Sequence, residues 1–229
     1  AVPAPASGGA PCDSCGARKL CQAVELGCGT AVHIGTRRLR AGEAAYRAGD
    51  PFRNLYVSRA GACKSIRLHR DGRQQITGFQ LGGELLGLDA IATGRHQTDA
   101  VALQDLVLCV LPYNDICAAG ERAGDVHRSM ARMLSAEIVR EASLMLLVGH
   151  LSAEERIAAL LADLAERLAA RGYCATAFTL RMSREEIGAH LGMKLETVSR
   201  MLNRLQRRGL IALHGKDVRI LDLPALKLV

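Results

Sequence analysis

The sequence predicts an α+β protein with a small β-barrel or jelly roll, a long helix and a C-terminal winged helix-turn-helix. Three observations predict this class. Short segments in which apolar and polar residues alternate, separated by turns, run from about residue 35 to residue 119. Helical periodicity replaces them over 126–149. A helix that begins with a capping box at Ser152–Glu155 follows over 152–171, and a helix, a turn, a second helix and a hairpin follow over 183–221. The expected divisions are a cysteine-rich segment (1–29), a barrel (30–120), a dimerisation helix (121–149) and the winged helix-turn-helix (150–229).

Composition limits the classes of partner. The chain has 229 residues, 49% of them hydrophobic, enough to bury the cores of two modest domains. Its 30 Lys and Arg against 23 Asp and Glu give a net charge of +7, which favours nucleic acid over an anionic membrane surface. Aromatic residues make up only 3%, which argues against a stacking platform for single strands. With no signal-like segment and no apolar run of about 18 residues, we expect a cytoplasmic protein without membrane association.

The barrel is predicted from strands and their turns. Asn54–Ser58 alternates between apolar and polar residues, and Cys63–Arg70 and Gln75–Gln80 flank an Asp-Gly turn at 71–72. Leu106–Leu111 forms a further strand, which Pro112 closes. Many short strands at this spacing are typical of a small barrel or jelly roll.

The helix that follows carries a heptad seam. Successive seam positions are alternately four and three residues apart, and this spacing favours a parallel dimer over a helix packed only on its own domain. The seam residues are Leu134, Ile138, Glu141, Met145 and Val148. Glu141 interrupts the seam, and we hypothesise that two such carboxylates facing each other in a two-fold dimer keep the inactive chain monomeric or loosely paired. The alternative is that Glu141 turns outward or pairs with Arg140 of the partner subunit.

The last third contains a DNA-reading unit. Ser183–Glu186 is a capping box, Leu191–Met193 is a three-residue turn containing Gly, and a second helix is predicted over Lys194–Arg208. The second helix has an apolar stripe of Leu195, Val198, Met201, Leu202 and Leu205. A hairpin wing around His214–Asp217 follows. The turn, the apolar stripe, the basic side of the second helix and the wing together predict binding to double-stranded DNA.

The polar face of this helix has side chains that suit base edges and phosphates. Glu196 and Arg200 are four residues apart, where Arg can bond bidentately to guanine and Glu can accept from cytosine. Thr197 and Ser199 lie between them, and Arg204, further along, suits a phosphate. The alternative is that Glu196 and Arg200 form an ordinary surface ion pair.

The run Arg181–Arg200 resembles the helix-turn-helix of the FNR/CRP family of bacterial regulators, and the similarity extends over essentially the whole chain. The resemblance implies a barrel like that of cyclic-nucleotide-binding proteins, a homodimer, RNA polymerase as partner, and inverted half-sites like TTGAT and ATCAA. In the oxygen-responsive FNR branch, the Glu, Ser and Arg of the motif E-T-x-S-R read the half-site, here Glu196, Ser199 and Arg200. Lys194 departs from the Thr or Ser often found at the helix start, which puts the local cap in doubt.

Three cysteines near the N-terminus have ligand-like spacing. Cys12-x2-Cys15-x5-Cys21 places three thiolates within a ten-residue loop, which can hold iron and sulfur or a zinc ion. Spacing alone slightly favours Cys28 as the fourth ligand. The resemblance reverses this preference, because it implies a barrel cysteine followed shortly by Pro, which Cys109 matches. A [4Fe–4S] cluster on Cys12, Cys15, Cys21 and Cys109 is therefore expected, with Cys28 as a spare thiol. The other cysteines have no such spacing and are expected in the core: Cys63, Cys117 and Cys174.

The expected function is an oxygen- or redox-responsive regulator of anaerobic genes, and two rivals stay open. A cyclic-nucleotide sensor is one, because Gly83 and Glu84 are present, although Gln97 stands where the resemblance calls for Arg, with Arg95 nearby. A zinc-stabilised DNA-binding protein without sensing is the other. An enzyme is not expected, since no catalytic triad order, Walker loop or H-E-x-x-H motif occurs.

Overall fold

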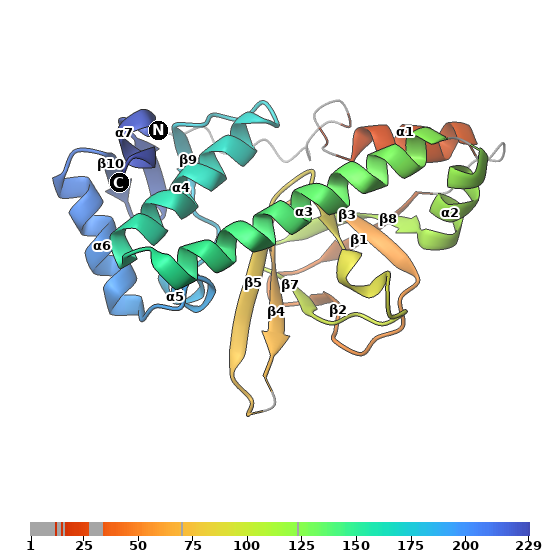
Figure 1. The fold of residues 1–229 in the computed structure, drawn as a ribbon, viewed down its shortest axis with the longest axis horizontal. Coiled ribbons are helices and arrows are strands. Elements are labelled where there is room, and N and C mark those ends of the chain that lie inside the picture. The colour runs from red at the N-terminus through yellow and green to blue at the C-terminus, as the bar shows by residue number, and fades with distance from the viewer. Residues whose placement is uncertain (1–11, 13–14, 16, 28–33, 70, 123) are drawn as a thin grey trace. The chain divides into compact units, whose positions relative to one another are not determined.

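The chain divides into two compact units, and each is described by itself. The first unit ends at Ile138 and the second begins at Val139, within the long helix α3 (Gly124–His150) that Figure 1 shows in green. The computed structural model describes residues 12, 15, 17–27, 34–69, 71–122 and 124–229.

The first unit is a jelly roll of two four-stranded antiparallel sheets, which confirms the predicted fold class. One sheet has the order β1-β8-β3-β6 and the other β2-β7-β4-β5 (Figure 1). Gly72 takes a left-handed φ of 84° in the predicted turn between β4 and β5. The strands are β1 (Gly35–Leu39), β2 (Ala44–Tyr46), β3 (Asn54–Ala60), β4 (Cys63–Leu68), β5 (Gln74–Gln80), β6 (Leu85–Leu86), β7 (Asp99–Ala102) and β8 (Leu106–Pro112).

Strand β8 divides its side chains between two apolar clusters. Leu106 and Leu108 lie in the core between the sheets, whereas Cys109 and Leu111 belong to a second cluster that includes helical residues. This is the period of two expected for a strand. The second cluster draws on α1 (Arg18–Gly27), α2 (Tyr113–Arg122) and the first turns of α3. The strand therefore presents Cys109 to the helices rather than to the centre of the barrel.

Several sequence expectations are corrected here. The segment around Cys21 was expected to be a loop, but Cys21 lies in helix α1, whose neighbouring Leu20 is fully buried. A helix of ten residues is marginal alone, so packing on the barrel unit, which the local pattern does not show, stabilises it. Cys63 is buried as expected, but the prediction of buried thiols at Cys117 and Cys174 is wrong, because both are exposed. Cys28 lies outside the described residues.

The second unit contains the predicted helices and wing. Capping boxes at Ser152 and Ser183 begin its first two helices, and Lys194 precedes the third without a side-chain cap, as its departure from Thr or Ser suggested. A third strand, β9, and a final short helix were not predicted. The elements are α4 (Ala153–Ala169), β9 (Ala177–Thr179), α5 (Arg184–Leu191), α6 (Leu195–Arg207), β10 (Ile211–His214), β11 (Asp217–Ile220) and α7 (Leu223–Lys227), with sheet order β10-β11-β9.

None of the helices in the described ranges is long and apolar enough to cross a lipid bilayer.

Candidate functional site

The turn between α5 and α6 is tight, and two glycines allow it. Gly192 ends α5 with a left-handed φ of 66°, a conformation that costs other residues about 1–2 kcal/mol. Gly188 lies so close to the turn that an added Cβ would sit 2.4 Å from the carbonyl oxygen of Met193. The turn thereby holds α6 against α5 in the compact arrangement of a helix-turn-helix.

Helix α6 has a buried side and a polar side. Val198, Leu202 and Leu205 are buried, as the predicted stripe requires. Leu195 is 44% exposed, so its assignment to the docking stripe is wrong. Leu195 lies in the first turn of α6, next to Glu196, and not on the buried side of the helix.

The predicted base-reading residues lie together on this helix. Glu196 and Arg200 are exposed, and Thr197 and Ser199 are half-buried. Arg200 Nη2 donates to Thr197 Oγ1 at 3.3 Å, and among the described residues Glu196 and Arg200 form no ion pair with each other. The surface ion pair offered as an alternative is therefore not what this arrangement shows, and both charges stay available to a ligand.

Sequence reasoning missed two residues that hold this surface. Arg184, at the first position of α5, donates from Nη1 to Ser199 Oγ at 3.0 Å. Glu154 of α4 is buried and pairs with Arg204 at 2.9 Å and Arg208 at 2.7 Å. Arg184 follows a visible capping box, which could have indicated its position, whereas no local pattern relates Glu154 to α6.

The predicted cysteine ligands come together at the second apolar cluster of the barrel unit. Cys15, Cys21 and Cys109 each pack, half-buried, against that cluster. Burial raises the pKa of Cys109, the Arg59 guanidinium opposes this shift, and the negative charges of Cys15 and Cys12 add to it. The barrel cysteine and two of the N-terminal cysteines thus share one apolar cluster despite their separation in sequence.

The chemistry of these thiols bears on the kind of group they could hold. Across the described ranges, no three His, Cys, Asp or Glu side chains lie close enough to hold a single metal ion. Thiolates are the ligands that iron–sulfur clusters take, and all four predicted ligands are cysteines. This donor set is of the kind that such a cluster takes.

The first turns of α3 pack against the same cluster. Buried Val126 belongs to it, and Met130 and Met133 lie against it with Cys21 and Cys109. The cysteine surface and the start of the long helix therefore share one packed core, so a change in one affects the packing of the other.

Further along α3, much of the predicted seam is solvent-exposed. Ile138 is 68% exposed, Met145 76% and Val148 37%, Glu141 is exposed, and Leu134 is half-buried. Two further exposed apolar side chains, Val139 and Leu146, lie outside the predicted seam. A run of exposed apolar residues on one helix is typical of a surface that a partner covers.

The polar groups weighed as ligands of a cyclic nucleotide are engaged within the barrel unit. Buried Glu84 accepts from the backbone N–H of Leu81 at 2.7 Å. Gln97 Nε2 donates to Thr93 Oγ1 at 3.0 Å, and Arg95 Nη1 donates to the backbone carbonyl of Gly49 at 2.7 Å. The Arg95 guanidinium thus connects its loop to the loop between β2 and β3, and a neutral amide at position 97 supplies no charge for a cyclic phosphate.

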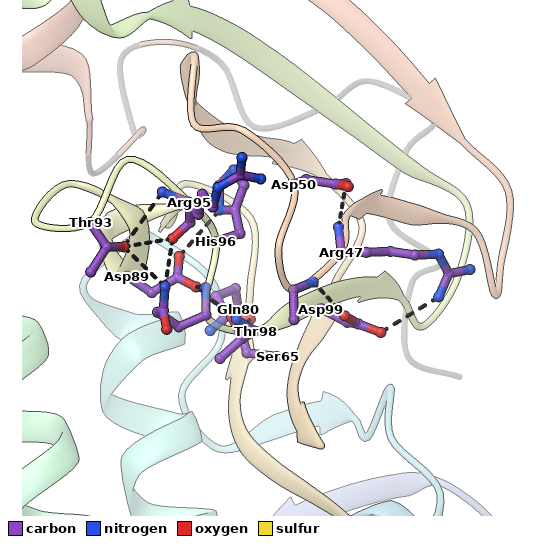
Figure 2. Close-up of polar contacts among 12 residues, drawn as sticks. Arg47, Asp50, Ser65, Gln80, Asp89, Thr93, Arg95, His96, Thr98 and Asp99 are labelled. Atoms are coloured by element: carbon purple, nitrogen blue, oxygen red, sulfur yellow. Dashed lines mark hydrogen bonds and ion pairs between the residues drawn. The ribbon is translucent and has the colours of Figure 1, made fainter. Parts of the chain in front are cut away.

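A buried histidine stabilises the same loop. The His96 ring stacks on Tyr46 with centroids 3.6 Å apart, and its Nδ1 lies 3.4 Å from Asp89 Oδ1. Asp89 also accepts from the backbone N–H and hydroxyl of Thr98, both at 2.9 Å. This packing and the hydrogen bonds account for the histidine without a ligand (Figure 2).

Comparisons with known proteins match both units. Residues 36–121 match the cyclic nucleotide-binding domain, and residues 155–229 match the Crp-like helix-turn-helix domain. The chain is 42% identical over 190 residues to the transcriptional regulatory protein Btr of Bordetella pertussis, covering 83% of this chain and 78% of that protein. It is 37% identical over 182 residues to the fumarate and nitrate reduction regulatory protein of Escherichia coli, covering 80% and 73%.

Two further relatives extend the comparison. The transcriptional activator Anr of Pseudomonas aeruginosa is 41% identical over 186 residues, which cover 81% of this chain and 76% of that protein. The solved structure of FixK2 from Bradyrhizobium japonicum superposes with a TM-score of 0.77 at 31% identity, covering 85% of this chain and 96% of that one.

Proposed function

Because the chain belongs to the CRP/FNR family of transcription regulators, we propose that it is an oxygen- or redox-responsive homodimer that regulates anaerobic genes through a [4Fe–4S] cluster. Its relatives are transcription regulators, and it is not an enzyme. Two relatives support this proposal: the protein of Escherichia coli is a fumarate and nitrate reduction regulator, and that of Pseudomonas aeruginosa is a transcriptional activator. In this proposal the protein acts in the bacterial cytoplasm, where its DNA and RNA polymerase are found.

One observation carries the proposal. Cys109, from a strand of the barrel, lies in the same apolar cluster as Cys15 and Cys21 and close enough to Cys12 for their charges to interact. Under the proposal these four thiolates hold the cluster, whose reaction with oxygen supplies the signal. Burial raises the pKa of Cys109, and the Arg59 guanidinium favours the thiolate that a ligand must become.

The protein's own residues give this site a mechanical role. Ligands from α1 and from β8 would hold α1 at the apolar cluster that both elements share, where Leu20 is already buried. Val126 and Met130 of α3 pack in the same cluster, so holding α1 in place also fixes the start of the dimer helix. We propose that this coupling favours pairing along Leu134, Ile138, Glu141, Met145 and Val148.

Dimerisation would place two copies of α6 on one palindrome. Glu196, Ser199 and Arg200 then read half-sites like TTGAT and ATCAA, with Thr197 supporting Arg200 through its hydroxyl. Arg204 lies at the flank of this surface and contributes backbone contacts only to the extent that it leaves Glu154.

The test is iron and sulfide analysis of protein purified without air. We expect a brown protein with inorganic sulfide that fades in air, and a Cys109→Ser variant that lacks the sulfide and binds its operator weakly. Cys117→Ser is the matched control, because Cys117 is exposed and unassigned to the site, and this variant should keep wild-type iron and sulfide.

Other outcomes would point to the rivals. A colourless protein that contains zinc but no sulfide would support a zinc-stabilised regulator, and DNA binding that requires cyclic nucleotide would support a nucleotide sensor. Equal operator affinity with and without iron and sulfide would overturn the proposal.

A further inference from the structure

A buried carboxylate of the C-terminal unit holds two arginines of the recognition helix. Glu154 is 8% exposed in the first turn of α4, and its two oxygens take separate partners. Arg204 Nε lies 2.9 Å from Oε2, and Arg208 Nη1 lies 2.7 Å from Oε1. The start of α4 is already capped by Ser152 and Glu155, so Glu154 is not needed for the cap.

The two arginines lie beside the reading face. Glu196, Arg200, Asn203 and Arg207 recur every three or four residues, which places them along one side of α6, and all four are exposed. Arg204 and Arg208 are each one position further along, which turns them toward the flank of α6 that faces α4. Arg207 has no carboxylate partner among the described residues. One helix thus carries a free arginine and two paired ones.

We propose that Glu154 withholds Arg204 and Arg208 from DNA phosphates and is thereby a specificity-determining residue. Arginines on phosphates raise affinity for every sequence alike, whereas base contacts distinguish sequences. A carboxylate bridging two guanidinium groups lowers the positive charge that the flank offers to DNA. Glu154 therefore reduces binding to unrelated DNA more than binding to the operator, where base contacts add to the affinity. This rests on DNA binding by the helix-turn-helix and not on the cysteine site.

The direct test removes the charge at position 154. Full-length Glu154→Gln and wild type are titrated against an operator duplex and a shuffled duplex of equal composition, over a series of salt concentrations. Gln keeps the side chain's shape, so release of the arginines should tighten binding to the shuffled duplex several-fold. The plot of log affinity against log salt should steepen by about 0.9 for each arginine that reaches a phosphate. The ratio of operator to shuffled affinity should fall.

Glu166→Gln is the matched control. It removes one carboxylate from the same helix, but the ion pair that it breaks is with Lys227 of α7, not with α6. This variant should keep the wild-type salt slope and affinity ratio. If both variants tighten binding equally, net charge alone explains the effect and the proposal fails. It also fails if a folded Glu154→Gln weakens binding to both duplexes with an unchanged slope, because the role is then only structural.

A second comparison needs no change at Glu154, in case that variant does not fold. Arg207→Gln should lower the salt slope by about 0.9 for each bound protomer, as expected for a free phosphate contact. Arg204→Gln should change the slope much less, because its guanidinium is already paired. If the two substitutions lower the salt slope equally, the proposal is overturned. Binding to shuffled DNA can be measured whether or not the protein contains iron and sulfide. The proposal for Glu154 and the proposal for the cluster can therefore be tested independently.

Discussion

Two surfaces of the molecule are assembled in different ways. The reading surface consists of Glu196, Thr197, Ser199 and Arg200, and the cysteine surface consists of Cys15, Cys21 and Cys109. All the predicted base-reading residues lie on one helix, and the glycine turn and capped helix before it are contiguous with it in sequence. The cysteine surface combines an N-terminal helix with a strand from the far end of the barrel. A locally built site keeps its geometry as long as its own domain folds. A site built from distant segments depends on their docking, which is what a sensor requires if a signal is to change it.

The two surfaces also differ in what stabilises them. Helix α6 has three fully or nearly buried side chains, Val198, Leu202 and Leu205, along its length. Helix α1 is ten residues long, and the only residue of it described as fully buried is Leu20. We therefore expect the cysteine surface to be the more easily disrupted, and the following substitutions test that contrast.

The largest effect is expected at Leu20. Leu20→Ala removes a fully buried side chain and should weaken docking of α1 by about 2–5 kcal/mol. Hydrogen exchange should accelerate in α1 but not in α6, and bound iron should be lost faster in air. Leu68→Ala is the control, because Leu68 is 62% exposed on the same unit and should change neither. Unchanged exchange in α1 would show that its docking does not depend on Leu20.

A smaller and more selective effect is expected on the reading surface. Arg200→Ala should cost about 1–3 kcal/mol at one guanine of the half-site and relax selection there, with the fold intact. The measurement is binding to a set of duplexes that differ at single positions. Arg207→Gln should instead weaken binding to all of them alike, as a phosphate contact does. If Arg200→Ala instead lowers affinity for all the duplexes equally, Arg200 contacts a phosphate and not a base.

The sequence predicted the locally determined parts best. Capping boxes, the glycine turn and the Asp-Gly hairpin depend on a few adjacent residues, and the structure has all of them. Alternation in β8 was also visible, although it does not say which face is covered by helices. Helix α1 was missed because the spacing of Cys21 from the preceding cysteines indicated a ligand loop, and a segment of ten residues is too short to be a stable helix alone.

Burial that depends on neighbours far along the chain was predicted poorly. Cys117 and Leu195 sit at positions where composition suggests a core, yet both are exposed because no other segment covers them. The Glu154 bridge to Arg204 and Arg208 joins α4 to the recognition helix across a long separation in sequence. For the cysteine site, spacing alone favoured Cys28, and only the family resemblance pointed to Cys109, which packs against the same apolar cluster as Cys15 and Cys21.

The smallest effect is expected at the predicted dimer seam of helix α3. Glu141 is exposed between Ile138 and Met145, whose side chains are more than two-thirds exposed. If this stripe pairs with its own copy, two carboxylates approach each other, and their repulsion across water-exposed surface amounts to about 1 kcal/mol. Glu141→Ala should therefore strengthen dimerisation of air-exposed protein about fivefold in sedimentation, and Glu141→Gln should reproduce the gain because it removes charge but not size. An unchanged association constant in both variants would mean that Glu141 turns outward, and a weakened association would mean that it pairs with Arg140 of the partner subunit. The weak pairing of the inactive chain would then have to come from the packing of α1 and α3 alone.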